Sequence, residues 1–261
     1  MFRRLPTLAL GALLLASSTS LLAAQPTTLT VLSSGGIMGA IREVAPAYEK
    51  ATGVKLEIAA APSMGDTPQA IPNRLARKEP ADVVLMVGSA LDKLIADGQA
   101  VKDSRVDLGQ SFIAMAVRQG APKPDISSME AFKQTLENAQ SVAYSDSASG
   151  VYLSRVLFPR LQLGEAFKAK AHMIPAVPVG EVVARGEAQI GFQQLSELKP
   201  VPGIDIVGLI PDQAQKMTLY SGAVVSHSQH PEAARALLKY LASKDAAKAI
   251  EDSGLKPISA Q

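Results

Sequence analysis

The stretch that decides the fold covers residues 29–50 and reads Leu-Thr-Val-Leu-Ser-Ser-Gly-Gly-Ile-Met-Gly-Ala-Ile-Arg-Glu-Val-Ala-Pro-Ala-Tyr-Glu-Lys. Residues 29–32 are apolar or β-branched, which predicts a short buried strand. Residues 33–36 are all small, and from Ile37 onward apolar side chains recur with helical spacing. The stretch therefore predicts a strand, a tight turn and a helix.

The turn of this unit consists of Ser33, Ser34, Gly35 and Gly36, a composition that suits an anion site. A helix N-terminus presents free N–H groups and the positive end of the helix dipole. Small residues let an anion come close to those donors. An ordinary strand-to-helix turn explains the same residues equally well, because Gly and Ser are common in turns. The glycine spacing differs from that of a dinucleotide-binding fingerprint.

The first residues predict a secretory leader. Arg3 and Arg4 precede an apolar run over residues 8–15, and residues 22–24 offer a small-residue cleavage site before Gln25. No Cys stands at that site, so a lipid anchor is not expected. We expect residues 1–24 to be removed and the mature protein to be periplasmic and without a membrane anchor. An uncleaved anchor is the alternative interpretation.

Charge and cysteine content exclude several classes of function. The sequence has 26 basic and 24 acidic residues, and losing Arg3 and Arg4 with the leader leaves 24 of each. A neutral chain argues against nucleic acid as a partner, because phosphate binding needs a basic face. The absence of Cys rules out disulfides and a thiolate nucleophile. The three histidines lack metal-ligand spacing, so neither a metal nor another cofactor is expected.

Strands and helices are predicted to alternate along the rest of the chain, which indicates an α/β fold. Gly53 is placed to end the first helix, and residues 54–61 predict the next strand. Thr67 is expected to cap a helix that Pro72 then kinks. Residues 81–87 form a continuous apolar run, typical of a parallel strand that is covered on both faces.

A second strand–turn–helix unit follows about 110 residues after the first. Its strand is expected at residues 141–144, and a later strand at residues 189–192 runs into two glutamines. Two such turns predict two lobes that face each other across a cleft, with ligand at the strand C-termini. The candidate binding residues of this half are Ser147, Ser149, Gly150, Gln193 and Gln194.

Four segments in this order resemble the periplasmic molybdate-binding proteins. They are residues 30–36, the strand entry Pro80-Ala81-Asp82-Val83, residues 147–152 and residues 190–193. The resemblance covers residues 28–256 and implies a two-lobed α/β periplasmic solute-binding fold of type II, with a ligand cleft between the lobes. The first lobe would hold residues 25–110 plus 219–261, and the second residues 111–218.

The resemblance also implies positions that hold the anion. Carried over one by one, these fall at Ser33 to Gly36, at Ser63, at Ser149 and Gly150, and at Gln193 and Gln194. Two positions depart from the family's pattern: its first-turn serine falls on or beside Gly36, and its cleft tyrosine on or beside Gln194. Losing two hydroxyl donors disfavours a compact tetrahedral oxyanion. Open glycine and extended glutamines suit a flatter ligand with several acceptors, such as a small carboxylate.

The sequence is similar, too, to an isomerase branch of this fold, in which a periplasmic enzyme interconverts the cis and trans forms of a small unsaturated tricarboxylate. That resemblance implies a proton carrier, and Tyr152 and Asp146 are the candidate catalytic residues. A buried core tyrosine and a turn-capping aspartate are the alternative interpretations of this pair. The alternative function is a receptor that delivers a molybdate-like oxyanion or a small carboxylate to an ABC permease. Arg74, Arg77 and Arg155 are further candidates for clamping a carboxylate, with an ordinary solvated helix face as the alternative interpretation.

Overall fold

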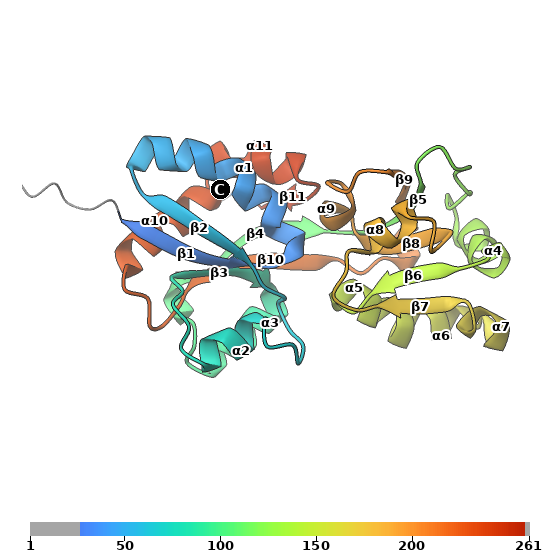
Figure 1. The fold of residues 1–261 in the computed structure, drawn as a ribbon, viewed down its shortest axis with the longest axis horizontal. Coiled ribbons are helices and arrows are strands. Elements are labelled where there is room, and N and C mark those ends of the chain that lie inside the picture. Colours follow the sequence, from blue (N-terminus) through green and yellow to red (C-terminus); the bar gives the residue numbers. More distant parts are fainter. Residues whose placement is uncertain (1–26, 259–261) are drawn as a thin grey trace, which may run out of the picture.

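The computed structural model describes residues 27–258, which contain two mixed β-sheets with helices packed around them (Figure 1). The predicted leader, residues 1–24, lies outside this range. The first sheet has the strand order β11-β4-β10-β3-β1-β2, and the second has the order β7-β6-β8-β5-β9. Each sheet with its helices makes one lobe, so the fold has the two-lobed α/β architecture expected from the sequence.

The first sheet is formed by β1 (Thr28–Ser33), β2 (Lys55–Ala60), β3 (Val83–Val87), β4 (Val106–Ser111), β10 (Thr218–Val224) and β11 (Lys256–Pro257). Its helices are α1 (Gly35–Thr52), α2 (Ile71–Ala76), α3 (Gly88–Ala96), η1 (Lys102–Ser104), α10 (Pro231–Leu241) and α11 (Lys244–Asp252). Strand β1 pairs in parallel with β2 and β3, while β10 runs antiparallel between β3 and β4.

The second sheet is formed by β5 (Ile113–Arg118), β6 (Val142–Ser145), β7 (Ala171–Ile174), β8 (Ile190–Gln194) and β9 (Ile204–Leu209). Its helical segments are α4 (Met129–Asn138), α5 (Ala148–Tyr152), the π-helical η2 (Leu153–Leu157), α6 (Phe158–Leu161), α7 (Gly164–Lys168), α8 (Val179–Ala184), α9 (Leu195–Leu198) and η3 (Asp212–Ala214). Strand β6 is parallel to β7 and β8, and β5 is antiparallel to β8 and β9.

The chain passes between the two sheets twice. Phe112 alone separates β4 of the first sheet from β5 of the second, and residues 210–217 lead from β9 back to β10. The predicted lobe boundaries at residues 110/111 and 218/219 stay a prediction. Strand β10 follows the second connection, and α9 is joined to the first by a hydrogen bond from the Leu195 N–H to the Phe112 carbonyl, so both lie where the lobes meet (Figure 1).

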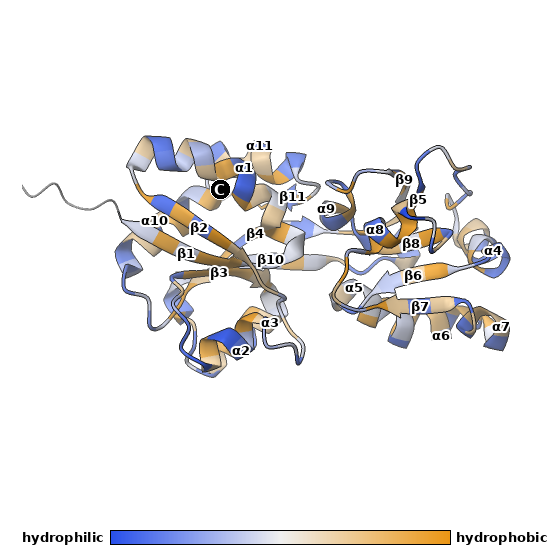
Figure 2. Cartoon of the chain, viewed as in Figure 1, coloured by the Kyte–Doolittle hydropathy of each residue, from blue (hydrophilic) through white to orange (hydrophobic). Residues whose placement is uncertain are grey.

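Each lobe has its own apolar core, and Figure 2 shows the hydrophobic colour concentrated on the strands. All five residues of β3 are buried, as the continuous apolar run predicts. The Asp82 carboxylate, at the entry to this strand, accepts hydrogen bonds from the Thr30 backbone N–H at 2.9 Å and the Ser228 hydroxyl at 2.6 Å. Asp82 therefore ties the start of β3 to β1, a structural role. None of the helices within residues 27–258 has the length and apolarity needed to cross a bilayer.

Local sequence signals located some element boundaries correctly and others wrongly. Gly53 ends α1 in a left-handed conformation with φ of 74°, and its N–H donates to the Glu49 carbonyl at 2.8 Å, which confirms the predicted cap. The predicted helix after Thr67 instead begins at Ile71. Pro72 lies in the first turn of that helix, where its missing N–H would have no intrahelical partner, so the predicted kink was wrong.

Strands β4, β7 and β11 were not predicted, and a single strand was expected over residues 111–118. The chain leaves one sheet after Ser111 and enters the other at Ile113, so two strands meet where one was expected. Strand β4 contains Asp107 and Gly109, residue types that are rare in strands, and β7 exposes His172 and Met173. Pairing with neighbouring strands outweighs the weak local preference of these segments.

Candidate functional site

The first turn leaves a buried serine hydroxyl without a partner. The Ser34 backbone N–H donates to the Leu85 carbonyl at 2.9 Å, which fixes the turn against the middle of β3. The Ser33 hydroxyl donates to the Ser34 carbonyl at 3.2 Å. Ser34 is the N-cap of α1, yet its hydroxyl makes no capping hydrogen bond and Oγ is buried with no partner within the described residues. An unpaired buried polar atom is costly, so the Ser34 hydroxyl is available for a hydrogen bond to a ligand.

Gly35 and Gly36 contact side chains that come from distant parts of the chain. A Cβ built on Gly35 would lie 2.7 Å from Oε1 of Glu197, and one built on Gly36 would lie 2.0 Å from the hydroxyl oxygen of Tyr220. Any other residue at these positions would displace those side chains. The two glycines therefore serve to bring a carboxyl and a phenol against the N-terminus of α1.

Tyr220 lies on β10 and supplies a hydroxyl to the first turn. Its side chain is buried, with 3% of its surface exposed. Burial raises the pKa of Tyr220 well above its ordinary value, and the neighbouring charge of Glu197 raises it further. The phenol therefore stays protonated at neutral pH and can donate a hydrogen bond. It lies beside Gly36, the position where the family resemblance implies a serine hydroxyl.

Glu197 lies on α9 of the second lobe and reaches the first turn of α1. Its Oε2 is buried and has no hydrogen-bond partner among residues 27–258. Burial raises its pKa from 4.5 to about 7, hydrogen bonds from the Gln193 side chain and the Gln194 backbone lower it, and the charge of Asp146 raises it. A carboxyl group that titrates near neutral pH can both accept and return a proton under physiological conditions.

The two glutamines at the end of β8 have different surroundings. The Gln193 Oε1 accepts a hydrogen bond from the Val179 N–H at 2.9 Å, at the start of α8. The Gln194 Nε2 donates to the Thr218 hydroxyl at 2.8 Å, and its Oε1 is buried with no partner in the described chain. The Thr218 hydroxyl can donate as well as accept, so it can bond to either end of the Gln194 side-chain amide. The amide can therefore flip and present its NH₂ group to an anion.

The second turn satisfies its own polar groups. The Ser145 hydroxyl lies 2.8 Å from the Ser147 hydroxyl and 3.2 Å from that of Ser149, and each distance is a hydrogen bond. A Cβ built on Gly150 would lie 1.6 Å from the Ser145 carbonyl oxygen. Packing against β6 therefore requires Gly150 to be a glycine, whether or not a ligand approaches. Ser147 is the N-cap of α5 but makes no side-chain capping bond.

The two candidate catalytic residues have hydrogen-bond partners within the second lobe. The Tyr152 hydroxyl donates to the Ala214 carbonyl at 3.0 Å, and its ring packs against the core of the second lobe. Asp146 is exposed, and its Oδ2 accepts a hydrogen bond from the Ala176 N–H at 3.3 Å. The contacts of Tyr152 match the core tyrosine that the sequence left open as an alternative, whereas Asp146 bonds to a residue 30 positions away and does not cap its own turn. Their catalytic roles stay predictions.

Ser63 follows β2 and joins the first turn to the end of β3. Its hydroxyl oxygen accepts a hydrogen bond from the Val87 N–H at 3.0 Å, and 7% of the residue is exposed. The Ala61 N–H donates to the Ser33 carbonyl at 2.9 Å, so this loop starts beside the first turn. The Ser63 hydroxyl proton is not used in the bond to Val87 and is free to donate.

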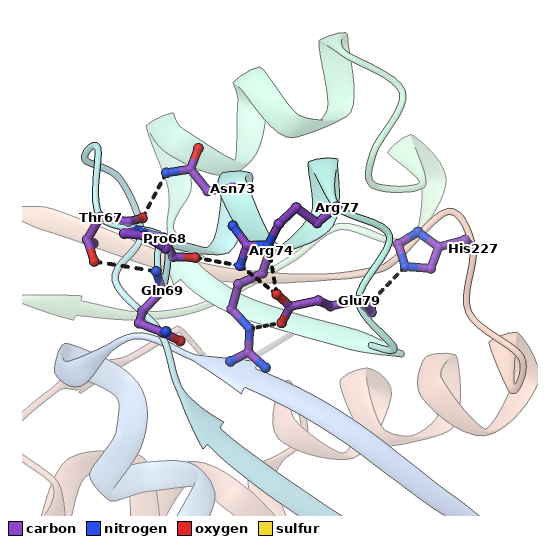
Figure 3. A network of polar contacts seen from close by, with 8 residues as sticks. All are labelled: Thr67, Pro68, Gln69, Asn73, Arg74, Arg77, Glu79 and His227. Atoms are coloured by element: carbon purple, nitrogen blue, oxygen red, sulfur yellow. Dashed lines mark hydrogen bonds and ion pairs between the residues drawn. The ribbon is translucent and has the colours of Figure 1, made fainter.

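Arg74 and Arg77 lie in a network of polar contacts within the first lobe (Figure 3). Glu79 Oε2 accepts from Arg74 Nε at 2.7 Å, and Glu79 Oε1 accepts from Arg77 Nε at 3.0 Å. The Glu79 backbone carbonyl lies 2.9 Å from Nε2 of His227. These contacts hold the segment after α2 against the loop after β10, and they give both arginines a carboxylate partner within the protein.

A hollow of about 360 Å³ lies between η1 and α10 of the first lobe. Its walls are formed by Arg105, Arg235, Leu238 and nearby residues, and it contains none of the turn residues described above. The polar atoms without partners therefore lie in a different place, at the junction of the lobes. Within residues 27–258 no group of three His, Asp or Glu side chains is arranged to hold a metal ion.

Sequence reasoning missed Glu197 and Tyr220. Glu197 follows the expected pair Gln193 and Gln194 but lies in an ordinary helical segment, and Tyr220 lies within an apolar strand. The one sequence signal that pointed toward these two side chains was the pair Gly35 and Gly36. Where the family pattern implies a serine and the chain has glycine, another residue must fill the space, but the sequence does not say which.

Comparisons with known proteins agree with this architecture. A family model described as "Bacterial extracellular solute-binding protein" matches residues 29–256. A protein from a Pseudomonas species that is named aconitate isomerase is 88% identical over 262 residues, covering 100% of both chains.

Two solved structures show the same fold at low sequence identity. The periplasmic molybdate-binding protein of Azotobacter vinelandii has a TM-score of 0.69 at 18% identity, covering 89% of this chain and 100% of that one. The tungstate-binding protein of Desulfovibrio alaskensis has a TM-score of 0.60 at 15% identity, covering 90% of this chain and 100% of that one. At this level of identity the likeness concerns the fold alone.

Proposed function

The chain belongs to the bacterial extracellular solute-binding protein family, and from this premise we propose that it is an aconitate isomerase, which interconverts cis- and trans-aconitate at the junction of its two lobes. The observation that carries the proposal is the 88% identity, over the full length of both chains, with a protein of that name. Aconitate isomerase is also the isomerase branch that the sequence resembles.

The donors at the first turn suit a ligand with several carboxylates. The Ser34 hydroxyl, the free N–H groups at the start of α1 and the Tyr220 phenol all lie at one place. Donors of this kind bind carboxylate oxygens through charge-assisted hydrogen bonds. The Gln194 amide and the Ser63 hydroxyl add donors around them. Ser147, Ser149 and Gly150 would lie beside the far end of the ligand, with the Ser147 and Ser149 hydroxyls still bonded to Ser145.

The reaction requires stabilisation of negative charge. A 1,3-proton shift removes a proton from the CH₂ group of aconitate and forms an allylic carbanion, whose charge spreads into an adjacent carboxylate. Preorganised donors aimed at that carboxylate stabilise the transition state more than the substrate. The N-terminus of α1, which is an 18-residue helix, supplies such donors together with the positive end of its dipole. Closure of the lobes would exclude water and strengthen each contact.

The second candidate function is that of a receptor for an ABC permease. The fold favours it, because the structural relatives include proteins named for binding molybdate and tungstate. A receptor has only to bind and release its ligand. The same family membership supports a periplasmic location for either function, after removal of the leader that residues 1–24 predict.

Turnover of the purified protein separates the two functions. We expect the protein to convert cis-aconitate into trans-aconitate until the two isomers reach equilibrium. Chromatography of samples taken over time measures both isomers. Calorimetry with molybdate, sulfate, citrate and the two aconitates is the companion measurement. Tight binding of molybdate, with no binding or conversion of the tricarboxylates, would establish the receptor function instead.

A further inference from the structure

We propose that Glu197 is the proton carrier of the reaction and that the Tyr220 hydroxyl holds the substrate carboxylate beside it. This inference rests on the proposed function and assigns roles within the same site. Neither residue was a candidate from the sequence. Both reach the N-terminus of α1 from other elements, Glu197 from α9 of the second lobe and Tyr220 from β10 of the first.

Geometry places Glu197 among the donors. Its Oε1 lies against Gly35, and Tyr220 lies against the next residue, Gly36. Three polar side-chain atoms within residues 27–258 are buried without a hydrogen-bond partner: Ser34 Oγ, Gln194 Oε1 and Glu197 Oε2. One comes from the first turn, one from the end of β8 and one from α9, which follows β8 directly. Three unsatisfied atoms at one junction indicate a site built for a polar ligand.

The protonation behaviour of Glu197 suits a carrier that works in both directions. Burial raises its pKa to about 7, and Asp146 adds to the rise. The charged group that acts on Glu197 is Asp146 after β6, and Glu197 in turn raises the pKa of Tyr220 on β10. An ionised carboxylate near this pKa is basic enough to take a carbon-bound proton, and its acid form gives the proton back readily.

Tyr220 contributes as a neutral donor. Its raised pKa keeps the phenol protonated, so it offers an O–H to a substrate carboxylate without adding negative charge. A substrate carboxylate held between Tyr220 and the free N–H groups of α1 lies next to Glu197, because Gly35 and Gly36 are consecutive. That arrangement puts the carbon beside this carboxylate within reach of Glu197.

A single carboxyl group can carry out both proton transfers of the reaction. The Glu197 carboxylate takes a proton from the CH₂ carbon: the C–H bond breaks, a carboxyl O–H forms, and the electron pair enters the allyl system. The double bond then shifts, and the same proton passes from Glu197 to the other end of the allyl system. A C–H bond forms there and the carboxylate is regenerated, so no oxidant, metal or second base is needed.

Asp146 and Tyr152 fit this role less well. Asp146 is exposed to solvent, and Tyr152 has its hydroxyl bonded to the Ala214 carbonyl. A base surrounded by water gains little from the preorganised environment on which catalysis depends. In the geometry described here, Asp146 acts on the reaction through its charge, which raises the pKa of Glu197.

Replacement of Glu197 tests the proposal. We expect Glu197→Gln to lower kcat about 10²- to 10⁴-fold, the range lost with a general base. Binding of tricarballylate, a saturated tricarboxylate that cannot react, should be retained in calorimetry, because the amide keeps the shape of the side chain. The kcat/KM of the wild type should rise with pH through about 7, as the ionised form of Glu197 accumulates.

Tyr220→Phe should act differently, by weakening tricarballylate binding while the pH profile keeps its form. Glu165→Gln is the matched control, since Glu165 is exposed on α7 and pairs with Lys168. Circular dichroism of each variant establishes that it is folded. If the wild type converts aconitate and folded Glu197→Gln retains full turnover, the role of Glu197 is overturned while the isomerase function stands. If the wild type itself fails to convert aconitate, the proposed function is overturned.

Discussion

The two strand–turn–helix units are alike in sequence and differ in how they satisfy their polar groups. At the first turn, the Ser34 hydroxyl is buried and has no partner in the part of the chain that the structure describes, and Gly35 contacts a side chain from the other lobe. At the second, the hydroxyls of Ser145, Ser147 and Ser149 bond to one another. The first turn is thus incomplete without a ligand, whereas the second is complete in itself.

The glycines of the two turns differ in the same way. Gly36 makes room for the ring of Tyr220, a side chain of the proposed site. Gly150 makes room for the backbone carbonyl of Ser145, within its own unit. A serine- and glycine-rich turn before a helix therefore does not by itself identify a binding site. What distinguishes the two is which atoms lie against the glycines and whether the hydroxyls have partners.

Substitution of the glycines should give the largest effect. Gly150→Ala places a methyl group 1.6 Å from a backbone oxygen, and we expect a loss of about 3 kcal/mol or more in the free energy of unfolding. Gly36→Ala clashes with the Tyr220 side chain and should cost about 1–3 kcal/mol. Urea denaturation measures both.

A double-mutant cycle sharpens this contrast. In a Tyr220→Ala background, Gly36→Ala should cost close to nothing, because its clash is with the ring that has been removed. Gly150→Ala should keep its full cost in the same background. Equal costs of Gly36→Ala in both backgrounds would show that Tyr220 does not determine the need for glycine.

The pH dependence of stability should arise mainly at the first turn, where Glu197 lies. The Glu197 pKa is raised on folding from 4.5 to about 7, so the folded state binds its proton more tightly than the unfolded state. Stability is therefore lost as pH rises from about 4.5 to about 7, by about 3 kcal/mol in total. Glu197→Gln should remove this loss and unfold at a higher temperature than the wild type at pH 8, with the gap narrowing toward pH 5.

The second turn contributes to this titration only through Asp146. Because the charge of Asp146 raises the pKa of Glu197, Asp146→Asn should move the loss of stability to lower pH. Thermal unfolding followed from pH 4 to pH 9 measures both variants. An unchanged profile in Glu197→Gln would show that Glu197 does not titrate in this range.

The serine pair should give the smallest effect. Ser34→Ala removes a buried hydroxyl that has no hydrogen-bond partner within residues 27–258, so stability without ligand should rise slightly, by about 1 kcal/mol. Loss of its bond to a substrate carboxylate should cost about 2 kcal/mol, which is roughly 30-fold in affinity. Ser147→Ala should show the reverse pattern, losing about 1 kcal/mol of stability with its bond to Ser145 and little affinity. Calorimetry with tricarballylate measures the affinity of each variant, and urea denaturation measures its stability. Equal losses of affinity in Ser34→Ala and Ser147→Ala would show that the two turns do not differ in ligand binding.

Several elements could be predicted closely from local signals. The strand over residues 29–32, the helix after it with its Gly53 cap, and the strand over residues 81–87 were expected close to where the structure has β1, α1 and β3. Each combines a clear apolar pattern with turn residues at one of its ends. Strands β4, β7 and β11 have no such pattern, and only their pairing within the sheets makes them strands.

The sequence by itself determined the α/β alternation, the two Ser/Gly turns and the resemblance to a two-lobed binding fold, because periodicity and turn chemistry are properties of neighbouring residues. Only the tertiary structure decided which atoms meet at the first turn. Glu197 and Gly35 are 162 positions apart, and Tyr220 and Gly36 are 184 apart. No local preference encodes such contacts. Burial, which moves the Glu197 pKa to about 7, exists only once both lobes have folded around it.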